Sequence, residues 1–307
     1  MANISRRTLI AGASAIAITP FANSAPTASK PFKLMLNTST IRGQKLSLTA
    51  QIDVAAKAGY DAIEPWMNDI EQFVKNGGSL KDAGKRIKDA GMTMESAIGF
   101  FEWIVDDQEK RKKAHEIAKQ NMDMVAQMGG KRLAAPPTGA TNQPGINLYS
   151  AAERYRAILE LGRSFGVVPQ VELWGFSKNL SKLGEVALVA LEAKHPDACI
   201  LADIYHLFKG GSEFEGLKLL NGNALQVFHI NDYPKGFERE TIGDKDRVYP
   251  GDGIAPLPKI LKEMRIAGFQ GFLSLELFNR DYWEQDAFQV CKTGLEKMKA
   301  VVAKSME

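Results

Sequence analysis

The chain has 307 residues, of which 45% are hydrophobic, and its 39 basic residues are nearly balanced by 36 acidic ones. A chain of this length and apolar content can bury a large core, as one barrel or as two smaller domains. The near-even charge argues against a nucleic-acid partner and against binding to an acidic membrane surface.

The first segment of the chain has the pattern of a targeting signal. The run Ser5-Arg6-Arg7-Thr8-Leu9-Ile10 precedes an apolar stretch of mostly small residues, 11–18, with no acidic residue before the first strand. This stretch is shorter than the ~20 residues of a membrane span, so we expect a cleaved signal rather than a stable membrane anchor. Adjacent arginines ahead of a mild apolar run resemble a bacterial twin-arginine leader. The alternative is a disordered basic tail.

We therefore expect residues 1–28 to be a signal peptide recognised by the twin-arginine export machinery, although the pattern does not fix the cleavage position. The mature protein is then periplasmic or otherwise exported. Removal of Arg6 and Arg7 leaves 37 basic against 36 acidic residues, which is close to neutral.

After the leader, short apolar runs alternate with amphipathic stretches that stop at glycines. We expect strands at residues 32–36, 60–64, 92–98, 132–135, 168–172, 199–203, 225–229 and 272–276. We expect helices at residues 46–58, 79–90, 108–128, 148–165, 180–194, within 214–220, and at 257–267 and 286–306. Alternation of this kind predicts a parallel sheet. Eight strands, with no Gly-x-Gly-x-x-Gly after any of them, favour a single (β/α)8 TIM barrel over residues 29–307.

Four of these strands end in side chains that bind metals. Glu172, Asp203, His229 and Glu276 each follow an apolar run directly, at intervals of 31, 26 and 47 residues. An α/β barrel places its functional residues at the carboxyl ends of its strands. One acidic residue there is often only a helix cap, but four in consecutive units predict a metal site. Three carboxylates and one imidazole suit Mg or Mn and admit Co or Zn.

Two further side chains are candidates for contact with a substrate. His206 lies three residues past Asp203, so we expect it just above the strand end, as a hydrogen-bonding or a structural residue. Arg247 lies in the long segment 231–253, which is too rich in Gly, Pro and charge for a regular element. Loops of this length are usually functional, and a guanidinium suits a polyhydroxylated or carboxylate substrate. The alternative for Arg247 is an ion pair on a solvated loop.

Another acidic residue and two tryptophans are ambiguous. Glu64 also ends a strand, and with Pro65-Trp66 behind it a substrate-site role and a structural role are equally supported. Trp66 and Trp174 are able to stack on a sugar ring, but packing in the core explains them equally well.

Together these residues resemble the xylose isomerase-like barrel superfamily, and are most similar to its sugar phosphate isomerase/epimerase group of ketose 3-epimerases, hydroxypyruvate isomerase and inosose-processing enzymes. The resemblance covers the chain after the leader. It implies one divalent ion, of which Mn, Co or Mg is favoured and Zn admitted. The leader departs from the cytoplasmic members and argues against a phosphorylated intracellular substrate. The implied ligands are Glu172, Asp203, His229 and Glu276, and the implied substrate contacts are His206 and Arg247.

The implied function is a metal-dependent sugar isomerase or epimerase that transfers a proton through a metal-stabilised enediolate of a sugar or polyol ketone. In this reading Glu172 and Glu276 are also the catalytic acid and base. One alternative is a dehydratase or lyase that acts on a keto-inositol or 3-keto-glycoside through the same first step. Another is an exported carbohydrate-binding protein without turnover. The substrate, the native metal and any homo-oligomer stay open.

Overall fold

The computed structural model describes residues 32–307. The predicted leader over residues 1–28, and the predicted start of the barrel at residue 29, lie outside these residues. Among the helices of residues 32–307, none is both long and apolar enough to cross a membrane. Cys199 and Cys291 are buried and are not joined by a disulfide.

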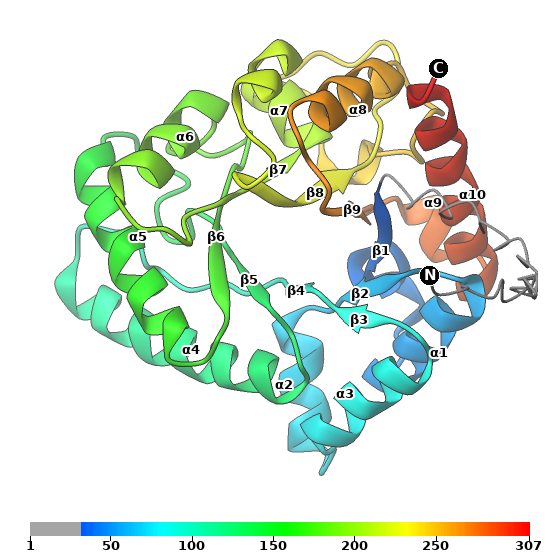
Figure 1. The fold of residues 1–307 in the computed structure, drawn as a ribbon, viewed down its shortest axis with the longest axis horizontal. Helices are drawn as coiled ribbons and strands as arrows, with labels where there is room; N and C mark the ends of the chain where they lie inside the picture. Colours follow the sequence, from blue (N-terminus) through cyan, green and yellow to red (C-terminus); the bar gives the residue numbers. More distant parts are fainter. Residues whose placement is uncertain (1–31) are drawn as a thin grey trace, which may run out of the picture. The chain divides into compact units, whose positions relative to one another are not determined.

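The strands form one parallel sheet that curves into a ring, with the helices outside it (Figure 1). The first and last strands of this sheet pair along four residues, from Lys33 with Phe272 to Leu36 with Leu275. The predicted TIM-barrel fold is therefore confirmed. The strands are β1 Lys33–Asn37, β2 Ala62–Glu64, β3 Thr93–Met94, β4 Ser96–Ala97, β5 Arg132–Ala135, β6 Val168–Glu172, β7 Ile200–Asp203, β8 Leu225–Ile230 and β9 Phe272–Leu275.

The third barrel strand is interrupted, which differs from the prediction of one strand over residues 92–98. Its first part, β3, pairs with β2, and its second part, β4, pairs with β5. Glu95 stands between them and pairs with Arg132 at the start of β5. A bridge between Trp66 and Ile98 continues the ladder beyond the break, so nine strand segments occupy eight barrel positions.

Most helices begin and end where the sequence predicts. For example, α1 begins after Ser47, whose hydroxyl accepts the amide of Ala50, and ends at Gly59 in the left-handed region (φ 95°). The helices are α1 Leu48–Ala58, α2 Met67–Lys75, α3 Leu80–Asp89, α4 Gln108–Gln127, α5 Leu148–Arg163, α6 Leu183–Glu192, α7 Ile204–Gly210, α8 Leu257–Ile266, α9 Arg280–Trp283 and α10 Ala287–Ser305, with 3₁₀ helices η1 Thr38–Gln44, η2 Phe214–Leu219 and η3 Asp244–Asp246.

Five of these elements were not predicted, namely η1, α2, α7, η3 and α9. The first three lie within three residues of a strand end, where a short amphipathic turn is hard to distinguish from a loop, and the other two are single short turns within loops. The start of α7 bears on the site, because Asp203 is its N-cap residue and its Oδ1 accepts the backbone amide of His206 at 2.9 Å.

The inside of the barrel is layered. An apolar layer contains Met35 of β1, Ala62 of β2, Leu201 of β7 and Val227 of β8, which pack in one cluster. Side chains alternate across a strand, so residues two positions further along each strand also face the interior. Those residues are polar and buried: Asn37, Glu64, Asp203 and His229. The strand periodicity therefore builds a polar layer above the apolar one, toward the carboxyl ends of the strands.

Candidate metal centre and active site

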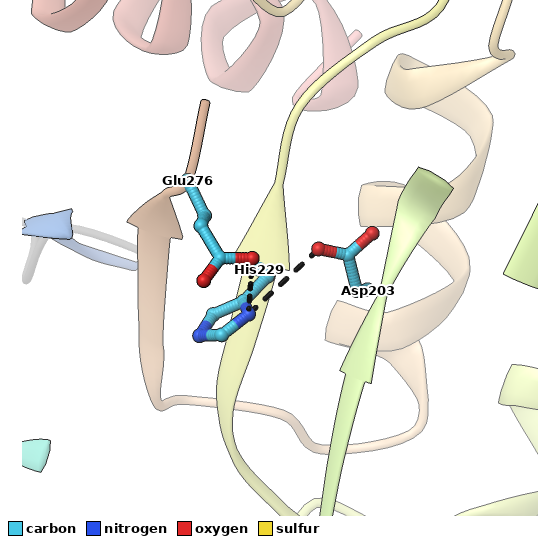
Figure 2. A group of neighbouring side chains, drawn as sticks. All are labelled: Asp203, His229 and Glu276. Carbon is cyan, nitrogen blue, oxygen red and sulfur yellow. Dashed lines mark ion pairs between the residues drawn. The ribbon is translucent and has the colours of Figure 1, made fainter. Parts of the chain in front are cut away.

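Three of the four predicted ligands lie together in the polar layer. Asp203 is the last residue of β7, His229 lies near the end of β8, and Glu276 follows β9 directly. One ligand atom from each lies within 4.8 Å of the others, and all three side chains are buried. Figure 2 shows them converging from neighbouring strands.

Nδ1 of His229 is the atom on which this group centres. It lies 3.2 Å from Oε2 of Glu276 and 3.7 Å from Oδ2 of Asp203. It is buried and has no aligned hydrogen-bond partner among residues 32–307. A buried nitrogen facing two carboxylates in this way fits a divalent cation, because a ligand atom otherwise loses its hydrogen bonds to water without compensation.

The fourth predicted ligand, Glu172, lies at the end of β6 and outside this group of three. Its carboxylate is buried, and Oε2 has no hydrogen-bond partner within the described part of the chain. Burial raises the pKa of Glu172 to about 8; the charge of Glu276 adds to this and that of His229 opposes it. Glu172 borders the same cavity as Glu276. Its roles as fourth ligand and catalytic residue remain predictions.

The two predicted substrate residues also border this cavity, and both are buried. Nη1 of Arg247 lies 3.0 Å from Oδ2 of Asp203 and 2.8 Å from Oε2 of Glu276. Nη2 of Arg247 lies 3.2 Å from Nε2 of His206 and also pairs with Asp244. Burial, followed by the positive charge of Arg247, lowers the pKa of His206 to about 4. His206 is therefore neutral near pH 7.

The charges of the group are strongly coupled. Burial lowers the pKa of His229, but the carboxylates of Glu276 and Glu64 outweigh it and raise that pKa well above the usual value. For Glu276, burial raises the pKa, but His229 and Arg247 outweigh it and hold the pKa well below its usual range. The metal-free site thus contains a protonated imidazole beside an ionised carboxylate.

Two asparagines hold the ligand carboxylates in place, and neither role was predicted. Nδ2 of Asn231 donates to Oδ2 of Asp203 at 3.0 Å, and Nδ2 of Asn37 lies 3.2 Å from Oε1 of Glu276. Both asparagines are fully buried. Their amide donors orient the carboxylates in the way that outer partners of metal ligands commonly do.

The long loop that carries Arg247 is fastened by one carboxylate. Asp232 accepts backbone amides from Tyr233, Gly251, Gly253 and Ala255 at 2.8–3.1 Å. In addition, its own backbone pairs with Val248, the neighbour of Arg247. The loop is therefore held in a defined conformation beside the ligand group, and Arg247 is not part of a solvated loop.

A cavity of about 190 Å³ opens beside Glu172 and Glu276. Much of its wall is aromatic, and the rings form a connected series in which neighbouring centroids lie 5.1–5.9 Å apart. Trp66 and Trp174, which were ambiguous from the sequence, both belong to this wall. The aromatic members are Phe278, Trp66, Phe100, Trp174 and Phe176.

A parallel barrel with buried carboxylates and a histidine at the carboxyl ends of its strands defines a TIM-barrel metalloprotein. The chain belongs to the xylose isomerase-like TIM barrel family, whose model matches residues 52–301. The family predicted from the residues is thus confirmed.

Individual relatives are distant in sequence but cover most of the chain. Inosose isomerase of Bacillus velezensis is 28% identical over 285 residues, which is 89% of this chain and 98% of that protein. Fructoselysine 3-epimerase of Escherichia coli O157:H7 is 25% identical over 253 residues, 76% of this chain and 86% of that protein. A crystal structure of the IolI protein with a bound zinc atom matches with a TM-score of 0.82 and 23% identity, over 89% of this chain and 99% of that one. The predicted class, a metal-dependent isomerase or epimerase, agrees with the family, these relatives and the buried ligand group.

Proposed function

We propose that this protein isomerises or epimerises a sugar or a cyclic polyol ketone, using one divalent cation held by Asp203, His229, Glu276 and Glu172. The observation that carries the proposal is the convergence of three buried ligands beside a cavity that Glu172 also borders. The names of the relatives, inosose isomerase and fructoselysine 3-epimerase, both denote the rearrangement of a polyhydroxylated carbonyl compound.

When bound, the cation supplies Lewis acidity that stabilises negative charge on a substrate oxygen. The donor set of three carboxylates and one imidazole favours Mn, Co or Mg and also accepts Zn, the metal in the IolI structure. The ligand side chains are buried, so bulk water has little access to atoms that react beside the cation.

Glu172 and Glu276 are placed to move the substrate proton. They come from different strands of the barrel, and both border the cavity. Their environments differ: the pKa of Glu172 is raised to about 8, whereas that of Glu276 is held below its usual range. A pair of carboxyl groups with separated pKa values suits opposite roles, with one accepting a proton while the other donates.

His206 and Arg247 complete the polar side of the cavity. The neutral imidazole of His206 can hydrogen-bond a hydroxyl group without placing a second charge beside Arg247. The guanidinium of Arg247 is fixed by Asp203, Glu276 and Asp244, so its remaining donors have a set direction. The aromatic side chains that line the same cavity suit the C–H face of a sugar or cyclitol ring.

Solvent deuterium exchange tests the proposed function. Purified, metal-loaded protein is incubated in D₂O with ketohexoses, inososes and 3-keto-glycosides, and the products are followed by NMR. Incorporation of deuterium beside the carbonyl with a change of stereochemistry or carbonyl position is the expected result. Loss of water or of a glycosyl group would assign the dehydratase or lyase alternative. Binding of a ketone with no exchange would instead identify a carbohydrate-binding protein.

We also propose that the protein is exported in folded form by the twin-arginine machinery. Support comes from the sequence alone, namely Arg6-Arg7 ahead of a short apolar run. A site assembled from distant strand ends exists only after the barrel has closed, so folded export lets the metal be acquired in the cytoplasm. Otherwise the outer compartment would favour the tighter-binding copper or zinc.

A further inference from the structure

Glu64 is a buried carboxylate of the barrel interior that has no place in the proposed reaction. It ends β2, lies in register with Asn37 of β1, and faces inward two positions after Ala62. Its side chain is fully buried. It does not border the cavity beside Glu172. An isolated ionised group in such a position is costly, so its partners indicate what it does.

Within residues 32–307, the hydrogen bonds of Glu64 all fall on one oxygen, Oε2, and Oε1 is buried without a partner. Its Oε2 accepts hydrogen bonds from Nδ2 of Asn37 at 2.9 Å and from the hydroxyl of Ser274 at 2.7 Å. The same oxygen lies 3.0 Å from Nε2 of His229. The amide nitrogen of Asn37 can only donate, so Oε2 acts as an acceptor. Ser274 is the residue of β9 in register with His229 of β8, and Glu64 reaches this pair from across the barrel.

The contact between Glu64 and His229 gives the two nitrogens of the imidazole different roles. Three partners on one carboxylate oxygen are best satisfied when all of them donate, so this contact favours a proton on Nε2 of His229, whether or not Nδ1 is protonated. The opposite edge, Nδ1, then faces Glu276 at 3.2 Å and Asp203 at 3.7 Å with no aligned hydrogen bond of its own among residues 32–307. Loss of the Nδ1 proton leaves a lone pair directed at these two carboxylates.

We propose that Glu64 is a positioning residue that holds His229 with a proton on Nε2, so that Nδ1 is the metal-binding atom. The inference rests on the metal site proposed above. Glu64 lies outside the group of three ligands. Its Oε2 is taken by three partners on the Nε2 edge of His229, and its Oε1 is buried without a hydrogen-bond partner among residues 32–307. Asn37 ties the arrangement together, since its amide also reaches Oε1 of Glu276 at 3.2 Å.

Nitrogen NMR of the wild-type protein tests this assignment without any substitution. The chain has only four histidines, so ¹⁵N-histidine labelling gives a resolvable spectrum. The probe is ¹¹³Cd²⁺, which couples to the nitrogen it binds. The expected result is ¹¹³Cd coupling to Nδ1 of His229, with a slowly exchanging proton on Nε2. Coupling to Nε2 overturns the inference and leaves the proposed metal site intact. Failure of Cd, Zn and Mn all to bind overturns both.

The substitution Glu64→Gln tests the positioning role itself. It keeps the shape of the side chain but replaces a carboxylate acceptor with an amide, and loss of such an outer partner commonly lowers metal affinity about 10–100-fold. We expect a fall of this size by calorimetric titration with Mn²⁺, together with faster exchange of the Nε2 proton. Unchanged affinity and exchange would overturn the role of Glu64.

The matched control is Glu185→Gln. It makes the same chemical change at a carboxylate that caps α6 by accepting the amides of Ser181 and Lys182, away from the ligand group. It is expected to leave Mn²⁺ affinity and the His229 spectrum unchanged. If Glu64→Gln does not fold, the wild-type ¹¹³Cd experiment still decides the assignment.

Discussion

Nη1 of Arg247 lies 2.8 Å from Oε2 of Glu276, and both side chains are buried. The guanidinium therefore balances the negative charge of the very carboxylate that is proposed to bind the cation. This pair gives Arg247 a role in the electrostatics of the site, in addition to its proposed contact with the substrate. Its two roles are separable by experiment.

Replacing Arg247 with Met should destabilise the metal-free protein by about 3–5 kcal/mol, because buried partners lose their counter-charge. Mn²⁺ should recover part of this loss by compensating the same carboxylates. The milder Arg247→Lys keeps the charge but not the planar fork, and should raise KM more than it lowers kcat. Denaturant unfolding with and without Mn²⁺ measures the first effect. Arg239→Met is the control, since Arg239 lies on the same loop as Arg247 but is exposed, where it pairs with Glu213 and lies over the ring of Phe208. A comparable loss there would contradict the interpretation.

Removing a ligand should remove the metal. His229→Ala and Asp203→Ala are each expected to lower metal affinity by more than the ~10–100-fold typical of an outer partner, while the barrel still folds. Elemental analysis after dialysis measures occupancy, and circular dichroism checks the fold. His195→Ala is the control, because this histidine is buried but lies outside the ligand group. Full occupancy in both ligand variants would refute the site.

Glu172 and Glu276 should matter for turnover beyond holding the cation. Gln at either position keeps an oxygen ligand but cannot accept the substrate proton. We expect kcat to fall by about 10²–10⁴-fold, and by far more than metal occupancy does. Rates of deuterium exchange in each variant, normalised to bound metal, measure this. Near-normal turnover in Glu276→Gln would exclude that residue as the essential base.

The metal-free protein should become less stable as pH rises from 6 to 9. The folded protein holds the proton of Glu172 up to a pKa of about 8, whereas the unfolded chain releases it near pH 4.5. His229 acts in the same direction, because its pKa is raised on folding. The stability that its bound proton contributes is lost as the pH rises through the pKa of the folded protein. Glu276, whose pKa is lowered, contributes a constant amount over this window. Tm measured across the range with EDTA should fall, and Glu172→Gln should flatten the slope. A Tm that rises with pH in the wild type would contradict these shifts.

The proposed export route predicts a trapped precursor. Lys at both position 6 and position 7 keeps the charge but removes the paired guanidinium groups of the twin-arginine pattern. A folded, metal-loaded precursor should then accumulate in the cytoplasm. Cell fractionation followed by metal analysis checks this, with Lys33→Arg, at the start of β1, as a control outside the leader. Normal periplasmic amounts of the double variant would mean that folded export is the wrong route.

The sequence predicted the strands to within one or two residues, because apolar runs ending in a polar side chain are the signature of an α/β barrel. It missed the break at Glu95, since the run over residues 92–98 has no internal Gly or Pro to signal it. It also missed η1 and α2, which occupy the first turns after β1 and β2.

The ligand group was predictable for the same reason as the strands, whereas its supports were not. Glu64 and His229 are separated by 165 residues, and only the closure of the barrel brings them together. A signal for Glu64 did exist: it stands two positions after Ala62, just as His229 stands two positions after Val227. Asn37 stands two positions after Met35 in the same way, but asparagine at a strand end is equally common in turns, so its residue type and that of Asn231 did not indicate a role in the site.

The polar layer is divided between the two halves of the chain. Asp203, His229 and Glu276 belong to the second half, whereas Asn37 and Glu64, which hold two of them in place, belong to the first. A chain cut within the loop of residues 136–147 would therefore yield one fragment that has the ligands and Asn231 but lacks Asn37 and Glu64, and another that has Asn37 and Glu64 but none of the ligands. Metal affinity would then be a gauge of fragment complementation, rising only when the two pieces have closed into one barrel.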